Sequence, residues 1–249
     1  MVLLLLVDLD TDLAALRPLG GFFLLRTGAA PRSTLPTLAR TYEEEKCDVY
    51  GNSMTFRIQK VAGLLGAPEL RTAASITHQG LASRLWSAAL GCAVLYGRIP
   101  DLDARLMRWD ADGSAPDDLW LTEVRPLPGD AASLADAVLE GHLEPLAEAL
   151  RARYRLAAGL LRGNAASALA GAARQLAGWA RANGRPDADA RTRALVTELL
   201  AHPGLAGALD AGTLRRRSCC LYYRVPGGGV CGDCCFTRPP RSSPGAASG

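Results

Sequence analysis

Five of the seven cysteines of this chain crowd into one short C-terminal segment, which reads RRRSCCLYYRVPGGGVCGDCC. An adjacent pair, Cys219 and Cys220, is followed after ten residues by the knuckle Cys231-x-x-Cys234, and Cys235 stands directly behind it. Thiolates are soft ligands that suit zinc and iron-sulfur clusters. In a chain long enough to fold without disulfides, such a group more often binds metal, provided that the compartment is reducing. We therefore expect the C-terminal segment to hold a metal centre.

The spacing of these cysteines favours a two-iron cluster over a single zinc ion. A common zinc site pairs two C-x2-C knuckles, whereas this segment has one. Neighbouring side chains of an extended backbone point to opposite faces, so Cys219 and Cys220 reach one centre only if the chain turns between them. A [2Fe-2S] cluster takes four thiolates and offers a wider target. Structural zinc and a strained disulfide between the adjacent cysteines remain the alternatives.

The linker between the two pairs, RVPGGG, is suited to fold the chain back on itself. Pro226 fixes a bend, and Gly227 to Gly229 can adopt backbone angles that are closed to other residues. A phosphate-binding loop would need a Lys-Ser/Thr pair and a following helix, which this linker lacks. The linker therefore predicts that the knuckle returns to the adjacent pair.

The segment resembles the C-terminal signature of the FhuF-type ferric-siderophore reductases: a basic residue before Ser-Cys-Cys, a Tyr-Arg-x-Pro stretch and Cys-Gly-Asp-Cys. Residues 77–102 and 160–172 also look like recurrent blocks of that family. The resemblance implies a [2Fe-2S] cluster and one-electron transfer to Fe(III) in a hydroxamate-type siderophore, with release of Fe(II). Carried over residue by residue, it implies four cluster ligands: Cys219, Cys220, Cys231 and Cys234. Cys235 departs from the family pattern, and we expect it to be an inert or redox-labile thiol.

Basic and aromatic residues close to the cysteines are candidates for tuning or docking. Arg217 and Arg224 fall within the resembling signature, and guanidinium groups beside a negatively charged cluster favour its reduced form. They could also steer an acidic electron donor such as a reduced ferredoxin. Tyr222 and Tyr223 are expected either to shield the cluster or to pack on the rest of the protein. The neighbouring Arg215 and Arg216 can equally well be part of a solvated basic turn.

Two further residues are candidates for a substrate pocket. His78 is predicted to precede a helix at 78–96, capped by Ser75 or Thr77, and lies in a family-like block. Asn164 is interpreted either as the N-cap of a helix at 165–183 or as a polar contact with substrate or with the cluster segment. The histidines, His142 and His202 included, are expected on helix surfaces or at caps, because electron transfer needs no acid-base or nucleophilic group.

Bulk properties exclude several classes of function. With 249 residues and 49% hydrophobic content, the chain can bury a sizeable core. A net charge of +3, without basic-aromatic interleaving, argues against a nucleic-acid partner. The apolar start, Val2 to Val7, is interrupted at once by acidic residues and is neither a signal peptide nor a membrane span. We expect a cytoplasmic protein. Peripheral contact with a membrane is compatible with this expectation.

Periodicity predicts a mainly α fold of the α+β class, a helical bundle with a small hairpin or sheet. Helices are expected at 131–141, 143–163, 165–183 and 187–201, and two short strands at Leu106–Trp109 and Leu119–Val124. Trp86, Trp179 and Cys92 are expected in the core. We divide the chain into a helical domain at 1–213 with its small β element at about 104–126, a [2Fe-2S]-binding C-terminal loop module at 214–237, and a disordered tail at 238–249.

A different class of function is compatible with the same residues. The metal could tie the C-terminal loop module to the helices in a non-enzymatic siderophore-binding or redox-sensing protein. Sequence does not identify the siderophore, the electron donor, the reduction potential, the pairing of cysteines on each iron or the oligomeric state.

Overall fold

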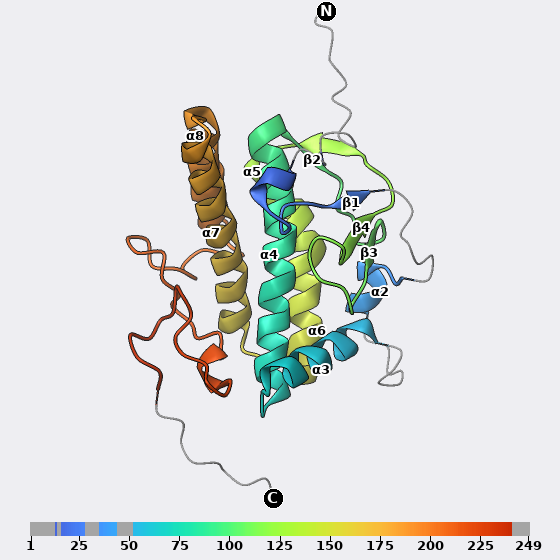
Figure 1. Ribbon diagram of the computed structural model, residues 1–249, viewed down its shortest axis with the longest axis vertical. Helices are drawn as coiled ribbons and strands as arrows, with labels where there is room; N and C mark the ends of the chain where they lie inside the picture. Colours follow the sequence, from blue (N-terminus) through green and yellow to red (C-terminus); the bar gives the residue numbers. More distant parts are fainter. Residues whose placement is uncertain (1–12, 14–15, 28–34, 44–51, 241–249) are drawn as a thin grey trace, which may run out of the picture.

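The computed structural model describes residues 13, 16–27, 35–43 and 52–240. Helices dominate, and small β pairings lie on one side of them (Figure 1), which confirms the predicted mainly α fold. The helical elements are η1 (Arg17–Leu19), α2 (Leu38–Tyr42), α3 (Ser53–Leu65), α4 (Leu70–Tyr96), α5 (Ala131–Leu134), η2 (Ala135–Leu143), α6 (Glu144–Tyr154), α7 (Ala158–Ala182), α8 (Pro186–Ala201) and η3 (Tyr222–Arg224). The division into domains stays a prediction, and Cys47, Val2 to Val7 and residues 241–249 of the tail lie outside the described residues.

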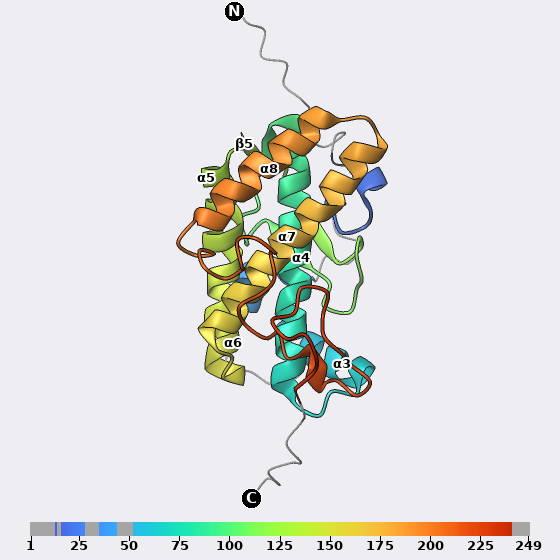
Figure 2. The ribbon, with the colours of Figure 1, turned by 90° about the vertical axis from the view of Figure 1, so that its left-hand side faces the viewer.

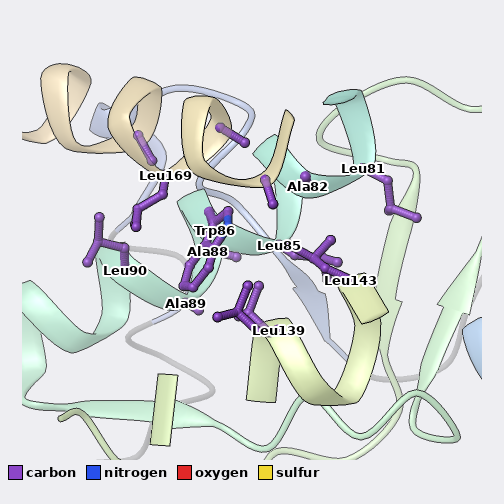
Figure 3. Packing of buried hydrophobic residues seen from close by; sticks show 14 of the residues in the cluster. Leu81, Ala82, Leu85, Trp86, Ala88, Ala89, Leu90, Leu139, Leu143 and Leu169 are labelled. Carbon is purple, nitrogen blue, oxygen red and sulfur yellow. The ribbon is translucent and has the colours of Figure 1, made fainter. Parts of the chain in front are cut away.

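Helix α4 is the central element, with α7 packed along it and α3 and α6 alongside (Figures 1 and 2). Its side chains are buried on nearly every face, as expected of a helix that is apolar all round. Trp86 is fully buried among leucines of η2, α4 and α7 (Figure 3), and Cys92 is also fully buried, so these two core predictions are confirmed. Trp179 is partly buried and packs against the core. Gly97, in the left-handed conformation, ends the helix as predicted, with its N–H bonded to the Ala93 carbonyl.

The predicted start of this helix at residue 78 is wrong. Helix α4 begins at Leu70, and Glu69 occupies the N-cap position without a side-chain cap. Ser75 and Thr77, predicted as caps, are buried within the helix, and so is His78. The error has a physical cause. The first turns of α4 are covered by the C-terminal segment, which is distant in sequence, and the polar residues that meet it interrupt the apolar pattern of the helix.

A second boundary, at residues 163–164, is also wrong. Helix α6 ends at Tyr154, with Arg155 in the left-handed conformation, and α7 then runs unbroken through Gly163 and Asn164. The helix predicted at 131–141 instead continues through η2, a π-helical stretch, into α6. Pro145 lies in the first turn of α6 and Pro186 in that of α8, where proline costs the helix no hydrogen bond.

The predicted hairpin is confirmed, and further strands surround it. β3 (Met107–Trp109) pairs antiparallel with β4 (Leu119–Leu121). β1 (Arg26–Thr27) adds to β4 in parallel, and β2 (Arg98–Pro100) pairs with β5 (Pro126–Pro128). These further strands have only two or three residues, and β5 has prolines at both ends. Such short strands show too little alternation of apolar and polar residues to be predicted from sequence.

The C-terminal segment lies against one side of the bundle rather than extending its core. The chain after α8 lies beside α7 in Figure 1 and in front of the lower half of α7 in Figure 2, and its last described part lies near the N-terminal end of α4. Within the described part of the chain, no helix is both long and apolar enough to span a bilayer.

Candidate metal centre

Four thiols of the C-terminal loop module come together in space. Cys220 and Cys234 are buried, Cys219 and Cys231 are partly buried, and all four are free thiols. The Sγ atoms of Cys220 and Cys231 lie 3.5 Å apart. The adjacent pair is therefore not joined by a disulfide, and the knuckle does return to it, as the linker predicted.

Tight turns in the linker produce this return. After η3, the N–H of Val225 bonds to the Tyr222 carbonyl at 3.1 Å, and the N–H of Gly228 bonds to the Val225 carbonyl at 2.8 Å. A Cβ at Gly228 would lie 2.6 Å from the Tyr222 carbonyl oxygen, so only glycine fits there. Gly227 has φ 70°, which lies in the left-handed region.

A backbone bend follows the adjacent pair directly. Leu221 has φ 68°, and its N–H donates to the Cys219 sulfur at 3.3 Å. The Phe236 N–H donates to the Cys234 sulfur at 3.4 Å in the same manner. Such N–H···S hydrogen bonds stabilise anionic sulfur and are among the contacts that tune iron-sulfur clusters.

Burial and the neighbouring thiols shift the pKa values of two of these cysteines. Burial raises the pKa of Cys219, and the nearby Cys220 and Cys234 raise it further. Burial and then Cys220 also raise the pKa of Cys231. In both cases Arg216 acts in the opposite direction. Without a metal, Cys219 and Cys231 therefore favour the protonated form, and a bound metal would have to displace those protons, as is general for thiolate sites.

The arrangement of the donors suits a two-iron cluster. The sulfur of Cys220 lies beside that of Cys231, and Cys219 is near enough to Cys220 and Cys234 for both to raise its pKa. Four free thiols with two N–H···S bonds provide the donor set that a [2Fe-2S] cluster requires.

Arg216 is the residue that sequence reasoning missed. Its side chain is 3% exposed, so it does not belong to a solvated turn. Both terminal nitrogens donate to Asn164 Oδ1 at 2.8 Å, and one of them also donates to Gln79 Oε1. Its Nε lies 3.4 Å from the Asp233 carboxylate, and its backbone N–H bonds to the Asp233 carbonyl at 2.9 Å. One guanidinium thus joins α4, α7 and the cysteine knuckle.

Asn164 belongs to this network and is not an N-cap. Its Nδ2 donates to the Ser75 carbonyl at 2.9 Å, and the Ser75 hydroxyl donates to the Cys220 carbonyl at 2.8 Å. Of the interpretations left open, contact with the cluster segment is the one that the structure shows. The sequence gives little indication of this role, because an asparagine buried inside a helix and an asparagine at a helix N-cap can have the same neighbours in sequence.

The other basic and aromatic candidates lie around the rim of the module. Arg217 and Tyr222 are exposed, whereas Arg224 pairs with Glu69 and lies 5.7 Å from the Tyr223 ring centroid. Tyr223 packs edge-on against Phe236. Separately, Arg215 donates to the Cys234 carbonyl at 2.7 and 2.9 Å and so fixes the far end of the knuckle.

The histidines are not where sequence placed them, with one exception. His78 is 1% exposed, and burial, followed by Arg216, lowers its pKa to about 3. It lines a pocket of about 260 Å³ between α6 and α7 to which no residue of the C-terminal loop module contributes. His142 is fully buried and hydrogen-bonded to Tyr42 and the Leu102 carbonyl. His202 does cap, accepting the Gly204 N–H at 3.2 Å.

A close approach between α7 and the adjacent cysteine pair gives a direct test of this packing. A Cβ at Gly163 would overlap the Ser218 hydroxyl, while the Ser218 Cβ would be 3.5 Å away. We expect Gly163→Ala to weaken attachment of the module by about 1–3 kcal/mol, as overpacking does, and Ser218→Ala to relieve that loss in the double variant. Thermal loss of cluster absorption measures the effect.

The matched control is Gly178→Ala on the same helix, where an added Cβ meets nothing within 4 Å. It should leave the module unaffected and stabilise the helix slightly. Additive effects of Gly163→Ala and Ser218→Ala would show that these residues do not touch.

The comparisons with known proteins bear on this same segment. A search of curated proteins found no match to the chain. Residues 216–236 match the family model described as the FhuF 2Fe-2S C-terminal domain. The match begins at Arg216 and includes the four clustered cysteines, and that domain carries a [2Fe-2S] cluster. This segment of the chain is therefore similar to the iron-sulfur domain of the FhuF family, as its cysteine pattern indicated.

Proposed function

We propose that Cys219, Cys220, Cys231 and Cys234 hold the [2Fe-2S] cluster and that the protein is a ferric-siderophore reductase. The observation that carries the proposal is the convergence of four free thiols inside a segment matched to the FhuF 2Fe-2S C-terminal domain. The spacing of Cys220 and Cys231 Sγ, 3.5 Å, is close to the edge of about 3.8 Å of a tetrahedron with metal–sulfur bonds of about 2.3 Å. These two sulfurs would therefore be spaced to share one metal ion of the cluster.

The chemistry of the substrate explains why one electron is enough. Hydroxamates bind Fe(III) through hard oxygen donors, and the softer, less charged Fe(II) is held less strongly by them. The overall change is Fe(III) plus one electron to Fe(II), with no atom or proton transferred. The electron comes from a reduced one-electron carrier such as a ferredoxin. The cluster, when bound, supplies a one-electron relay between that donor and the iron of the substrate.

The residues of the chain contribute position and charge to this reaction. Leu221 and Phe236 N–H groups and the buried Arg216 guanidinium all favour negative charge at the sulfurs, and hence the reduced form. Cys219 and Cys231 remain partly exposed, which keeps the site close to a bulky substrate that cannot enter the protein. We place the reaction in the cytoplasm, where a reducing environment preserves Fe(II).

The experiment is an anaerobic one-turnover assay. Dithionite-reduced protein, freed of excess reductant, is mixed with ferric desferrioxamine B in the presence of a ferrous chelator. We expect the oxidised visible bands to return and about one Fe(II) to be trapped per cluster. The gallium(III) complex, which has the same charge and shape but accepts no electron, is the control. Unchanged bands with the ferric complex would defeat the reductase proposal even if the cluster is present.

A non-enzymatic role has one specific observation in its favour. The module is fastened to the helices at several points, by Arg216, by Ser75 and by the Arg224–Glu69 pair. A metal there could serve mainly to hold the C-terminus in place. That reading predicts that substitution of a ligand cysteine loosens the module, while the intact reduced protein leaves ferric desferrioxamine B untouched.

A further inference from the structure

A groove between α4 and α7 runs up to the cysteine knuckle. It has a volume of about 380 Å³, and its walls include Gln79 and Ser83 of α4, Ser167 and Gly171 of α7, and Gly232 of the knuckle. Gly232 stands next to Cys231 in the chain. The groove therefore ends within a residue of a proposed cluster ligand.

Small residues keep this space open. A Cβ at Gly232 would meet nothing within 4 Å, and a Cβ at Gly171 would meet only the tip of Arg174, at 3.8 Å. Serines line the groove from both helices, beside the longer side chains of Gln79, Arg174 and Gln175. A ligand can therefore approach the knuckle along the two helices without any rearrangement of the backbone.

The inner end of the groove is fixed by the same buried guanidinium that supports the knuckle. Gln79 accepts a hydrogen bond from Arg216 and donates from Nε2 to Ser167 Oγ at 3.3 Å. Asp233, on the other side, pairs with Arg216 at 3.4 Å. The groove wall and the cysteine loop thus share one support, so a ligand in the groove is held at a fixed position relative to the thiols.

The chemistry of the walls selects the kind of ligand. Hydroxyl and amide groups predominate, and among the groove residues the charged groups are Arg174 and Asp233, of opposite sign. A ferric tris-catecholate carries three negative charges, for which these walls offer little compensation. A ferric hydroxamate complex presents carbonyl oxygens and amide links with little net charge, which hydroxyl and amide groups can bind.

We propose that this groove seats one side of a ferric hydroxamate complex next to the cluster, an assignment that rests on the proposed reductase function. Gly171 and Ser83 lie on opposite walls of the groove. A larger side chain at either position should therefore keep the substrate out of the groove. Both residues line the groove, and a Cβ at Gly171 would meet only the tip of Arg174, so the fold and the cluster should tolerate the change.

The test compares Gly171→Leu and Ser83→Leu with Gly178→Leu, a control on α7 outside the groove with nothing within 4 Å of an added Cβ. The Kd of the gallium(III) complex of desferrioxamine B is measured by calorimetry, and the second-order rate of reoxidation by the ferric complex by stopped flow. We expect both blocking variants to bind at least about 10-fold more weakly and to reoxidise correspondingly more slowly, with visible spectra and iron content unchanged. Gly178→Leu should match the unmodified protein.

The outcomes separate the two proposals. If the unmodified protein is reoxidised and the blocking variants behave like it, the groove assignment is overturned and the reductase stands. If the ferric complex does not reoxidise the unmodified protein at all, the proposed function fails and the groove assignment with it.

Discussion

Serine at Cys219, Cys220, Cys231 or Cys234 is expected to abolish the cluster, whereas Cys235→Ser is expected to retain it. Each of the four contributes a sulfur to the convergence described above, and a hydroxyl is a poor substitute for a soft thiolate on iron. Cys235 is also partly buried and close to Cys234, so it tests whether proximity alone makes a ligand. The five variants differ from the protein by one atom each, which makes them matched controls for one another.

The measurement is the visible absorption of anaerobically purified protein together with the electron paramagnetic resonance signal after reduction. We expect both to vanish, or to collapse to a small residual signal, in the four ligand variants and to persist in Cys235→Ser. Loss in Cys235→Ser combined with retention in one of the four would show that the ligand set is wrong. Far-ultraviolet circular dichroism should stay helical throughout, because the bundle has its own core.

Removing the guanidinium of Arg216 is expected to produce the second large effect. Arg216→Met keeps the volume of the side chain but leaves Asn164, Gln79 and Asp233 without their shared partner. Breaking a buried charge pair by deleting one partner typically costs about 3–5 kcal/mol. We expect this loss to fall on attachment of the module, since the contacts join the knuckle to α4 and α7.

Two comparisons sharpen this prediction. Arg217→Met changes the exposed neighbour and should leave the cluster as stable as before. Arg216→Lys keeps the charge but lacks the planar fork, and should fall between the two. The temperature at which cluster absorption is lost is the readout, with helical circular dichroism followed in parallel. Equal behaviour of Arg216→Met and Arg217→Met would refute a special role for Arg216.

Local patterns were enough to predict the class of fold and the seat of the metal. Cysteine spacing and a proline-glycine linker are short-range features, and they indicated a loop that brings the knuckle back to Cys219 and Cys220. The β3–β4 hairpin and the end of α4 at Gly97 follow from equally local signals. The family model then matched the segment that the cysteines had singled out.

What sequence could not reveal depends on contacts between distant residues. Three consecutive arginines look alike, and only burial distinguishes Arg216 from its neighbours. Ser75 and Asn164 interrupt apolar helix faces, and the sequence is compatible with a cap at either position because the partner that satisfies each side chain lies far away in the sequence. Polar residues that look misplaced on a helix were, in this protein, the anchors of the metal-binding loop.

The content of iron, acid-labile sulfide and zinc in anaerobically purified protein tests the central claim most directly. The account predicts about two iron and two sulfide per chain with little zinc, since the family domain carries a [2Fe-2S] cluster and the matched segment brings free thiols together. One zinc per chain without sulfide would contradict it. In that case neither the electron-transfer step nor the role given to the groove could be maintained.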